Sequence, residues 1–359
     1  MKNTIEFILI GTLSLVLALI FIPIIKKIAV AINLVDKPNY RKIHATPVPL
    51  VGGISIAITI LIVLIVSGNK LAIIKEYLPI LTSGVTLLIV GVIDDKTDIS
   101  AKYKLIIQLL LSFIIAFSGT RITSLYGLLG IYEITTWIQY ALTILVITGV
   151  VNAFNLMDGV DGLVGGLSLL GFTMFFIASI FYNNYFLGKI SVIFIGAIIG
   201  FLKFNLSKKK IFMGDAGSLF LGFILVTLGI QFMEKQQVNQ DYGYAYGFLI
   251  LVAFFSIPVL DSLRVYIGRI KQGNSPFKAD KSHLHHLLLT AGLTHKKISI
   301  FVVLFCMILF FVGFGLISFF STTIIIVAIM ILFWGIVKLL LMISSLHEWR
   351  DTIKKLEQQ

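Results

Sequence analysis

The sequence predicts an all-α polytopic membrane protein with about 10–11 transmembrane helices. Three observations lead to this fold class: 58% of the 359 residues are hydrophobic, only 13% are charged, and the mean hydropathy is +1.02. Soluble domains carry about 25% charged residues, so a chain this apolar is expected to lie in a membrane. The first apolar run follows Lys2 without a small-residue cleavage site, which predicts a span and not a removable signal peptide.

Eleven apolar stretches approach the roughly 20 residues that a helix needs to cross a bilayer. They are expected near 4–25, 48–67, 77–93, 105–119, 136–154, 162–182, 187–204, 217–233, 245–263, 298–319 and 322–345. No repeat or soluble domain interrupts them. We therefore predict a single transmembrane domain over 1–345, with its motifs within about 30–290, and a short tail over 346–359. Cys306 is the single cysteine, which excludes a disulfide framework and a cysteine metal site.

The orientation follows from the lysines and arginines, because cytoplasmic loops carry an excess of both residue types. Most of the 29 basic residues fall in loops on one side of the predicted arrangement. This predicts a multi-pass protein of the cytoplasmic (inner) membrane, with the N-terminus outside and the C-terminus in the cytoplasm. The net charge of +12 follows from the same asymmetry, so no nucleic-acid partner is predicted.

Aspartates gather in the loops of the predicted cytoplasmic side. The stretch "GVIDDKTDISAKYK" places Asp94 and Asp95 where the third apolar run ends; a solvated helix end would also explain this pair. In "NAFNLMDGVDGL", residues Asn155, Asp158 and Asp161 recur at a spacing of three, and they share one face if the segment is helical. Carboxylates near the bilayer are costly unless they are paired, so this stripe favours a functional site.

Two more cytoplasmic segments combine glycine or proline with polar residues. "PVPLVGG" contains Gly52 and Gly53, which allow another backbone to approach closely, although a rigid turn rimmed by cations is the alternative. "KKKIFMGDAGS" places Asp215 between two glycines at the start of an apolar run. A functional carboxylate and a helix N-cap without any further role are the two interpretations of Asp215 at this position.

The segment "SPFKADKSHLHHLLLTAG" collects three histidines, His283, His285 and His286, before a short amphipathic helix. A histidine cluster can bind a transition metal, but here it lacks the partners of a zinc site. Cationic or donor imidazoles that face phosphate are the better fit to the nearby lysines. Upstream, Asp261 and Arg264 are three residues apart, which a local ion pair alone would explain.

Together these loops present hard oxygen ligands, amides, cations and imidazoles at one membrane face. Carboxylates without soft ligands suit Mg²⁺ or Mn²⁺, which proteins usually hold together with substrate phosphates. The residues therefore predict a metal-dependent enzyme that handles phosphates at the cytoplasmic face. An ion-coupled transporter is the rival class, but it would carry its acids inside the spans, and here the acids cluster at one interface.

The motifs also resemble a known family, the polyprenyl-phosphate N-acetylhexosamine-1-phosphate transferases of glycosyltransferase family 4. The resemblance rests on "PVPLVGG", "DDKTD", "NAFNLMDGVDGL", "IFMGDAGS" and "SPFKADKSHLHHLL", in family order over roughly residues 30–290. "SPFKADKSHLHH" and Asp98 differ from the phospho-MurNAc-pentapeptide transferase branch, which has three consecutive histidines and a lysine there. The chain is more similar to the branch that starts O-antigen, enterobacterial common antigen and teichoic acid synthesis.

The resemblance implies a reaction and a role for each motif. Undecaprenyl phosphate would attack a UDP-N-acetylhexosamine, first of all UDP-GlcNAc, and release UMP, with Mg²⁺ held by Asp215. Asp94 would deprotonate or orient the lipid phosphate, and Asp95 would support it. The nucleotide-sugar would be bound by Asn155, Asp158 and Asp161, with Phe212 stacked on uracil. Phosphates would be held by Lys104, His283, His285, His286 and Arg264.

Three alternatives stay open at the level of the sequence. Another UDP-sugar, such as UDP-MurNAc-pentapeptide, could be the donor. The transfer could pass through a covalent phospho-aspartyl intermediate instead of direct attack by the lipid. The family pattern suggests a homodimer, but no motif in the chain reports the oligomeric state.

Overall fold

The structure is a computed structural model that describes residues 2–36, 46–68, 70–237, 244–275 and 282–356. Its chain forms two compact units, each of which is described by itself. The first unit contains residues 1–123 and 135–235, and the second contains residues 124–134 and 236–359. Several residues of the first predicted loop, and the lysines at 278 and 281, lie outside the described residues.

Each of the eleven predicted apolar stretches contains a helix, which confirms the all-α fold class. In the first unit the helices are α1 (Lys2–Ala31), α2 (Gly52–Val66), α3 (Lys70–Thr97), α4 (Ala101–Phe117), α5 (Thr136–Leu156), α6 (Leu163–Phe181), α7 (Tyr185–Asn205) and α8 (Gly214–Gln237). In the described part of the chain, nine helices are long and apolar enough to cross a membrane. Helices α2 and α4, with 15 and 17 residues, are shorter than the roughly 20 residues of a full span. The expected number of 10–11 spans therefore includes these two shorter helices.

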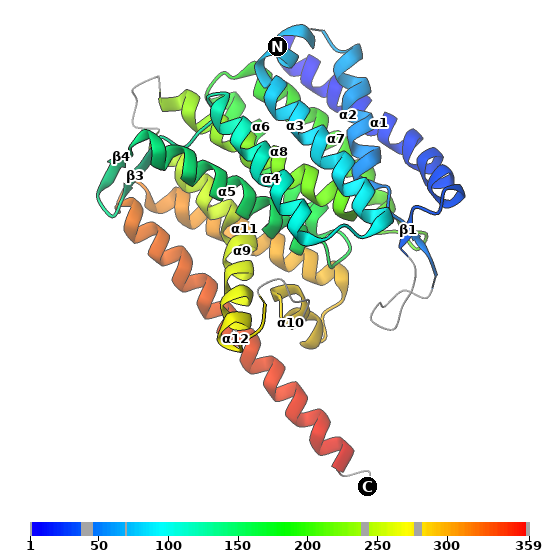
Figure 1. Cartoon of the computed structure of the whole chain (residues 1–359), viewed down its shortest axis with the longest axis vertical. Coiled ribbons are helices and arrows are strands. Elements are labelled where there is room, and N and C mark those ends of the chain that lie inside the picture. The colour runs from blue at the N-terminus through cyan, green and yellow to red at the C-terminus, as the bar shows by residue number, and fades with distance from the viewer. Residues whose placement is uncertain (1, 37–45, 69, 238–243, 276–281, 357–359) are drawn as a thin grey trace. The chain divides into compact units, whose positions relative to one another are not determined.

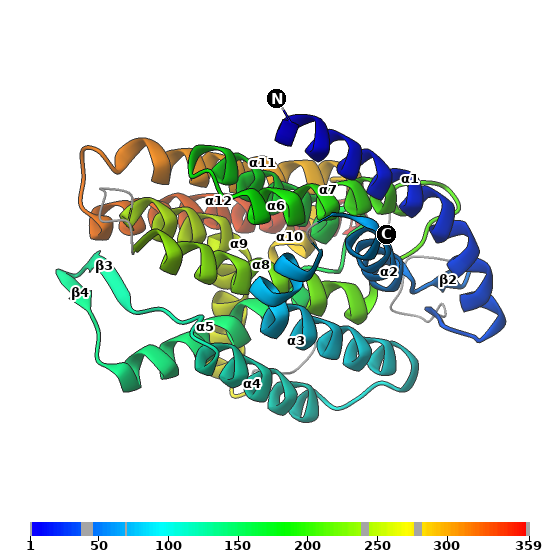
Figure 2. The same ribbon diagram turned by 90° about the horizontal axis from the view of Figure 1, so that it is seen from above.

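Helix α8 forms the centre of the first unit. It is apolar on every side, and almost all of its residues are buried, as expected for a helix that other helices surround. Helix α7 contributes Phe194, whose ring stacks on Phe220 of α8 at 6.0 Å. Helices α1 and α7 pack side by side (Figures 1 and 2). The first turn of α8 is thereby held inside the bundle, where its position is fixed by neighbours.

Two glycines allow the first turn of α8 to lie directly against α2 and α3. A Cβ atom added at Gly53 would be 2.3 Å from the backbone nitrogen of Gly217, and one added at Gly91 would be 2.4 Å from that of Ala216. These neighbouring atoms belong to backbone, so they cannot move aside as a flexible side chain would. The close contact therefore depends on the absence of a side chain on α2 and α3.

Short extended segments tie the first loop to the loop before α8. Strand β1 (Val35–Asp36) pairs antiparallel with β2 (Val48–Pro49). The Phe212 N–H donates to the Pro49 carbonyl at 2.9 Å, and the Gly52 N–H donates to the Phe212 carbonyl at 2.9 Å. These two bonds bring "PVPLVGG" and "IFMGDAGS" together, although about 160 residues separate them in the chain.

The second unit is built around α9 (Tyr244–Lys271), α11 (His295–Leu316) and α12 (Thr322–Leu356), which pack on one another. The hairpin of β3 (Ser124–Leu128) and β4 (Ile131–Glu133) joins them, and the Thr322 hydroxyl donates to the Tyr126 carbonyl at 2.6 Å. The short helix α10 (Leu284–Thr290) packs against α11 and α12. It is the amphipathic helix that the sequence predicts after the histidines.

The close packing at Gly91 predicts a loss of stability in Gly91→Ala. The new methyl group would have to push α3 away from α8, and overpacking of this kind costs about 1–3 kcal/mol. Thermal unfolding of the detergent-solubilised protein measures the effect. Gly149→Ala in α5 is the matched control, because among the described residues no atom lies within 4 Å of its added Cβ. If Gly91→Ala had the same melting temperature as the wild-type protein and the Gly149→Ala control, the close contact between α3 and α8 at Gly91 would be contradicted.

Candidate active site

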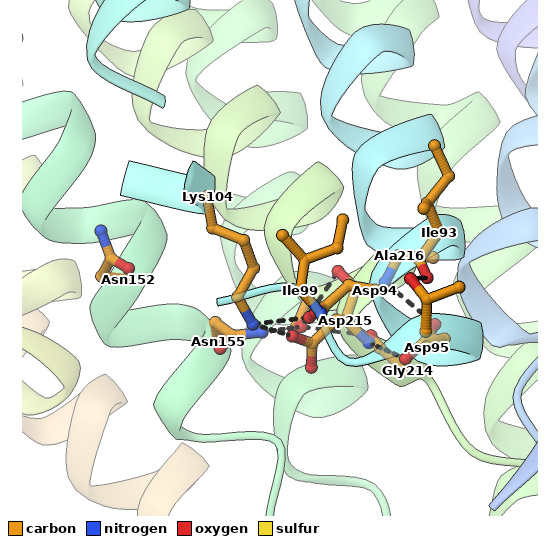
Figure 3. Close-up of polar contacts among 12 residues, drawn as sticks. Ile93, Asp94, Asp95, Ile99, Lys104, Asn152, Asn155, Gly214, Asp215 and Ala216 are labelled. Atoms are coloured by element: carbon orange, nitrogen blue, oxygen red, sulfur yellow. Dashed lines mark hydrogen bonds and ion pairs between the residues drawn. The ribbon is translucent and has the colours of Figure 1, made fainter. Parts of the chain in front are cut away.

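Four helix ends of the first unit bring the predicted carboxylates together. Asp94 and Asp95 lie in the last turn of α3, Asn155 lies in the last turn of α5, and Asp215 lies in the first turn of α8. Lys104 extends from the start of α4 toward Asp94 and Asp215 (Figure 3). Residues that are up to 121 positions apart in the chain therefore form one polar cluster.

Asp95 holds the N-terminus of α8. Its Oδ1 accepts the backbone N–H of Asp215 at 2.9 Å, and its Oδ2 accepts that of Ala216 at 3.3 Å. Free N–H groups and the positive end of the helix dipole favour a carboxylate at this place. Gly214 has φ +73°, and a Cβ there would lie 2.4 Å from Asp95 Oδ2. The cap of α8 therefore comes from α3, and the Asp215 side chain is not used as an N-cap.

Lys104 bridges the other two carboxylates. Its Nζ lies 2.5 Å from Asp94 Oδ2 and 3.0 Å from Asp215 Oδ2, and the Ile99 N–H donates to Asp94 Oδ1 at 2.7 Å. Burial by itself lowers the pKa of Lys104, but the Asp215 and Asp94 carboxylates outweigh burial, and the pKa is raised. The ammonium therefore stays charged, and a single positive charge faces two carboxylates.

Asn155 supports Asp215 from α5. Its side-chain amide hydrogen-bonds to the Asp215 carboxylate and also donates to the Ser218 hydroxyl at 3.0 Å. The Asp94 side chain is only 5% exposed, whereas that of Asp215 is 32% exposed. Asp215 is therefore the more accessible of these two carboxylates.

Asp158 lies in the turn between α5 and α6 and accepts the backbone N–H of Gly214. Burial, followed by the negative charges of Asp215, Asp95 and Asp161, raises the pKa of Asp158 well above its ordinary value. The surroundings of Asp158 therefore disfavour a further negative charge beside Asp215 and Asp95.

Asp161 and Phe212 share one partner, Lys210. The Lys210 Nζ lies 2.8 Å from Asp161 Oδ2 and 5.0 Å from the centroid of the Phe212 ring, a distance at which a cation interacts with the ring face. Lys210 therefore lies in contact with both Asp161 and the Phe212 ring and connects these two residues. Asn155, Asp158 and Asp161 do not share one helical face, because α5 ends before Asp158. Each of the three side chains has a different partner.

The histidines and Arg264 belong to the second unit, and we describe them separately. Arg264 donates to Asp261 Oδ1 at 2.7 Å, and His283 Nδ1 lies 2.9 Å from Asp261 Oδ2. The ring of His285 lies between His283 and His286, at centroid distances of 5.9 and 4.3 Å. The structure thus confirms the ion pair of Asp261 and Arg264 and extends it to a histidine.

The sequence left open whether these imidazoles are cations or hydrogen-bond donors, and His285 is not a cation. Burial, together with the neighbouring imidazoles of His286 and His283, lowers the pKa of His285 to about 3. Its ring is therefore neutral at physiological pH. His285 can contribute hydrogen bonds to a phosphate, but it does not contribute a positive charge.

The donor atoms near Asp215 fit a hard divalent cation. Among the described residues, no group of three or more histidine, cysteine, aspartate or glutamate side chains is arranged to hold a metal by itself. Mg²⁺ does not require such a group, because proteins commonly hold it with one or two carboxylates and substrate phosphates. Asp215 is half-buried and lies close to Asp94, and these two side chains are the carboxylates available for such a cation.

Sequence reasoning missed several residues that shape the site. Asn205 of α7 accepts the Gly162 N–H at 2.6 Å and donates to the Ile211 carbonyl at 2.8 Å, so it joins the loops that carry Asp161 and Phe212. Ser218 and Lys210 lie within "KKKIFMGDAGS", and Asp261 was considered only as the ion-pair partner of Arg264. Their other contacts are with Asn155, Asp161 and His283, which are distant in the chain, so a local sequence pattern does not show them.

Comparison with known proteins identifies the family. A model described as glycosyl transferase family 4 matches residues 77–233, which include the carboxylate cluster. The "Probable undecaprenyl-phosphate N-acetylglucosaminyl 1-phosphate transferase" of Bacillus subtilis (strain 168) is 35% identical over 79% of this chain and 77% of its own length. The undecaprenyl-phosphate alpha-N-acetylglucosaminyl 1-phosphate transferases of Yersinia pestis and Escherichia coli (strain K12) are 32% and 31% identical, over 82% of this chain and 80% and 79% of their own lengths. Because the likeness extends over most of both chains, this protein belongs to glycosyl transferase family 4, as its five motifs predicted.

Proposed function

We propose that the protein transfers GlcNAc-1-phosphate from UDP-GlcNAc to undecaprenyl phosphate and releases UMP. This would be the first membrane step in the synthesis of a cell-envelope polysaccharide. One observation carries the proposal: a half-buried carboxylate, Asp215, lies at a buried helix start beside Asp94 and Lys104. The names of the relatives supply the acceptor and the sugar phosphate.

The reaction needs positive charge because two phosphate groups must meet. At 4 Å, one pair of like unit charges costs about 4 kcal/mol at an effective dielectric of 20, and phosphate groups carry several such charges. Lys104 supplies one compensating charge in the cluster. Mg²⁺, or Mn²⁺, would be held by Asp215 and would neutralise the phosphate oxygens when bound.

The bond changes follow from direct attack. An oxygen of the lipid phosphate forms a bond to the β-phosphorus of UDP-GlcNAc, and the bond from that phosphorus to the oxygen shared with the α-phosphorus breaks. UMP leaves with that oxygen. Asp94 orients the lipid phosphate or takes its proton, and Lys104 holds the phosphates. Asp95 acts through α8, by keeping Asp215 in place.

The other residues are assigned to the nucleotide-sugar and to phosphates. Asn155, Asp158 and Asp161 would bind the nucleotide-sugar, and Phe212 would stack on uracil through the ring face that Lys210 does not cover. His283, His285, His286 and Arg264 would contact phosphates. Two of these imidazoles, His283 and His285, are buried, which favours hydrogen bonding over simple charge attraction.

We also propose the orientation that the basic residues indicate, with a cytoplasmic active site in the inner membrane and a homodimer as the assembled state. Ser207 and Asn183 are exposed residues on either side of α7. In a Cys306→Ala background, Asn183→Cys should react with an impermeant thiol reagent added to intact cells, and Ser207→Cys should not. If the reagent labelled Ser207→Cys in intact cells, the proposed orientation would be wrong.

A panel of UDP-sugars tests the proposed reaction. Purified protein with undecaprenyl phosphate should release UMP from UDP-GlcNAc faster than from UDP-GalNAc or UDP-MurNAc-pentapeptide. Release should require the lipid, because the sugar phosphate needs an acceptor. Preference for another UDP-sugar would change the substrate, whereas no UMP release from any of them would refute the transferase assignment.

Metal dependence is tested by removal and by Asp215→Asn. EDTA should abolish UMP release, and Mg²⁺ or Mn²⁺ should restore it. Asp215→Asn keeps the shape of the side chain but removes the charge that holds a cation, so we expect a loss of about a thousandfold, or roughly 4 kcal/mol of transition-state stabilisation. A thermal melt controls for folding. Near-normal turnover of folded Asp215→Asn protein would exclude the metal role.

Asp94→Asn separates direct attack from a covalent mechanism. The second pKa of a phosphate monoester is about 6, so the lipid is already largely dianionic above neutral pH. If Asp94 is only a base, the variant should lose about 10²–10⁴-fold at acidic pH and recover as pH rises and the lipid loses its own proton. An amide cannot attack phosphorus, so a covalent role predicts no recovery at any pH. UMP release measured between pH 5.5 and 9 distinguishes the two.

A further inference from the structure

Asp261 lies at the centre of a buried polar cluster in the second unit. Its side chain is fully buried, and it accepts hydrogen bonds from groups on two segments. Arg264 donates at 2.7 Å, the backbone N–H of Leu284 donates at 3.0 Å, and His283 Nδ1 lies at 2.9 Å. One carboxylate thus joins α9 to the start of α10. Arg264 also donates to the Ser282 carbonyl, which ties the same two segments together a second time.

These contacts determine which nitrogen of His283 carries the proton. The guanidinium of Arg264 is always charged, and a carboxylate paired with it accepts hydrogen bonds but does not donate them. The contact between His283 and Asp261 therefore requires a proton on Nδ1. In the neutral ring the other nitrogen, Nε2, then has no proton and is a hydrogen-bond acceptor.

His283 Nε2 is buried and has no hydrogen-bond partner among the described residues. The side chain of His283 is only 5% exposed, so water does not easily replace the missing partner. His285 Nδ1 and Arg264 Nε are buried and unpaired in the same way within the described part of the chain. An unpaired buried polar atom costs about 1–3 kcal/mol. Three of them on neighbouring residues indicate a polar ligand.

The chemistry of the three atoms indicates a phosphate monoester. A phosphate monoester carries both an ionisable hydroxyl, which can donate a hydrogen bond to the acceptor Nε2 of His283, and anionic oxygens that accept hydrogen bonds. The Nε–H of Arg264 is a donor suited to a phosphate oxygen. The diphosphate of a UDP-sugar lacks such an ionisable hydroxyl.

We propose that Asp261 is a positioning residue that directs His283 Nε2 to the phosphate monoester of a substrate or product. The inference rests on the proposed function, in which undecaprenyl phosphate and UMP are the two phosphate monoesters. Both have the same terminal chemistry, and a kinetic experiment can separate them. Asp261 is not one of the predicted substrate-binding residues, and it acts here only through His283.

His283→Asn provides the sharpest test. The asparagine amide can reach Asp261 in place of Nδ1, but it has no atom at the position of Nε2. The melting temperature should therefore stay close to wild-type. Loss of a hydrogen bond to a charged group should raise either the KM for undecaprenyl phosphate or the inhibition constant of UMP by about 10–100-fold. A change in the first would assign the site to the lipid, and a change in the second would assign it to UMP.

Asp261→Asn tests the positioning role. Because Asp261 acts through His283, the double variant Asp261→Asn/His283→Asn should be no worse than His283→Asn alone. In wild-type protein carrying ¹⁵N-histidine, the Nδ1 signal of His283 should be that of a protonated nitrogen, identified by its loss in His283→Asn. If Asp261→Asn does not fold, His283→Asn and this signal still decide the question.

His295→Asn at the start of α11 is the matched control and should leave both constants unchanged. Wild-type kinetics in folded His283→Asn protein, or independent multiplicative losses in the double variant, would overturn the inference. These results differ from failure of the proposed function, in which the wild-type protein itself would release no UMP.

Discussion

The hydrogen bonds from the start of α8 to Asp95 are the interaction on which the first unit's site depends. They bind the end of α3 to the beginning of a helix that lies about 120 residues later in the chain. They can form only because α8 approaches α2 and α3 at positions without side chains, at Gly53 and Gly91. Asp215 is placed by this contact, since it occupies the turn that Asp95 caps.

Asp95 accepts backbone N–H groups of α8, whereas the two neighbouring carboxylates contact a lysine. Asp94 and Asp215 share the ammonium of Lys104, which leaves negative charge in excess. A cluster of this kind is unfavourable by itself and is relieved by a further cation or by a proton. Burial first, and then the same excess of negative charge, raises the pKa of Asp158. In the proposed function, a divalent cation that binds together with the substrate phosphates would balance this charge.

Much of the fold could be predicted from the sequence, because long apolar stretches report helices directly. Every expected stretch contains a helix, and the expected loops carry the polar motifs. The lengths of α2 and α4 were less predictable, since a hydropathy pattern does not show where Gly52 must begin a helix to meet α8. The structure brings together Asp94, Asn155 and Asp215, which three separate motifs had marked.

The remaining details depend on long-range contacts that no local pattern contains. Adjacent aspartates look alike in "DDKTD", yet Asp95 contacts the backbone of α8 and Asp94 contacts Lys104. Asp261 looked like one half of a local ion pair, and its contact with His283, which precedes α10, forms only in the folded chain. The neutral state of His285 follows from its burial, which the three nearby histidines in the sequence do not indicate.

Comparison of Asp95→Asn with Asp94→Asn by thermal unfolding tests the central claim most directly. An asparagine at 95 offers one acceptor oxygen and turns an amide toward a backbone N–H, so about 1–3 kcal/mol of stability should be lost and the melting temperature should fall. An asparagine at 94 keeps an oxygen for the Ile99 N–H and turns its amide toward Lys104, but the ammonium retains Asp215 as a partner and the repulsion between the two carboxylates is lost. The melting temperature of Asp94→Asn should therefore fall less than that of Asp95→Asn. Asp95→Asn protein that melts like wild-type and yet releases no UMP would contradict the account, because Asp95 would then act in the chemistry and not through α8.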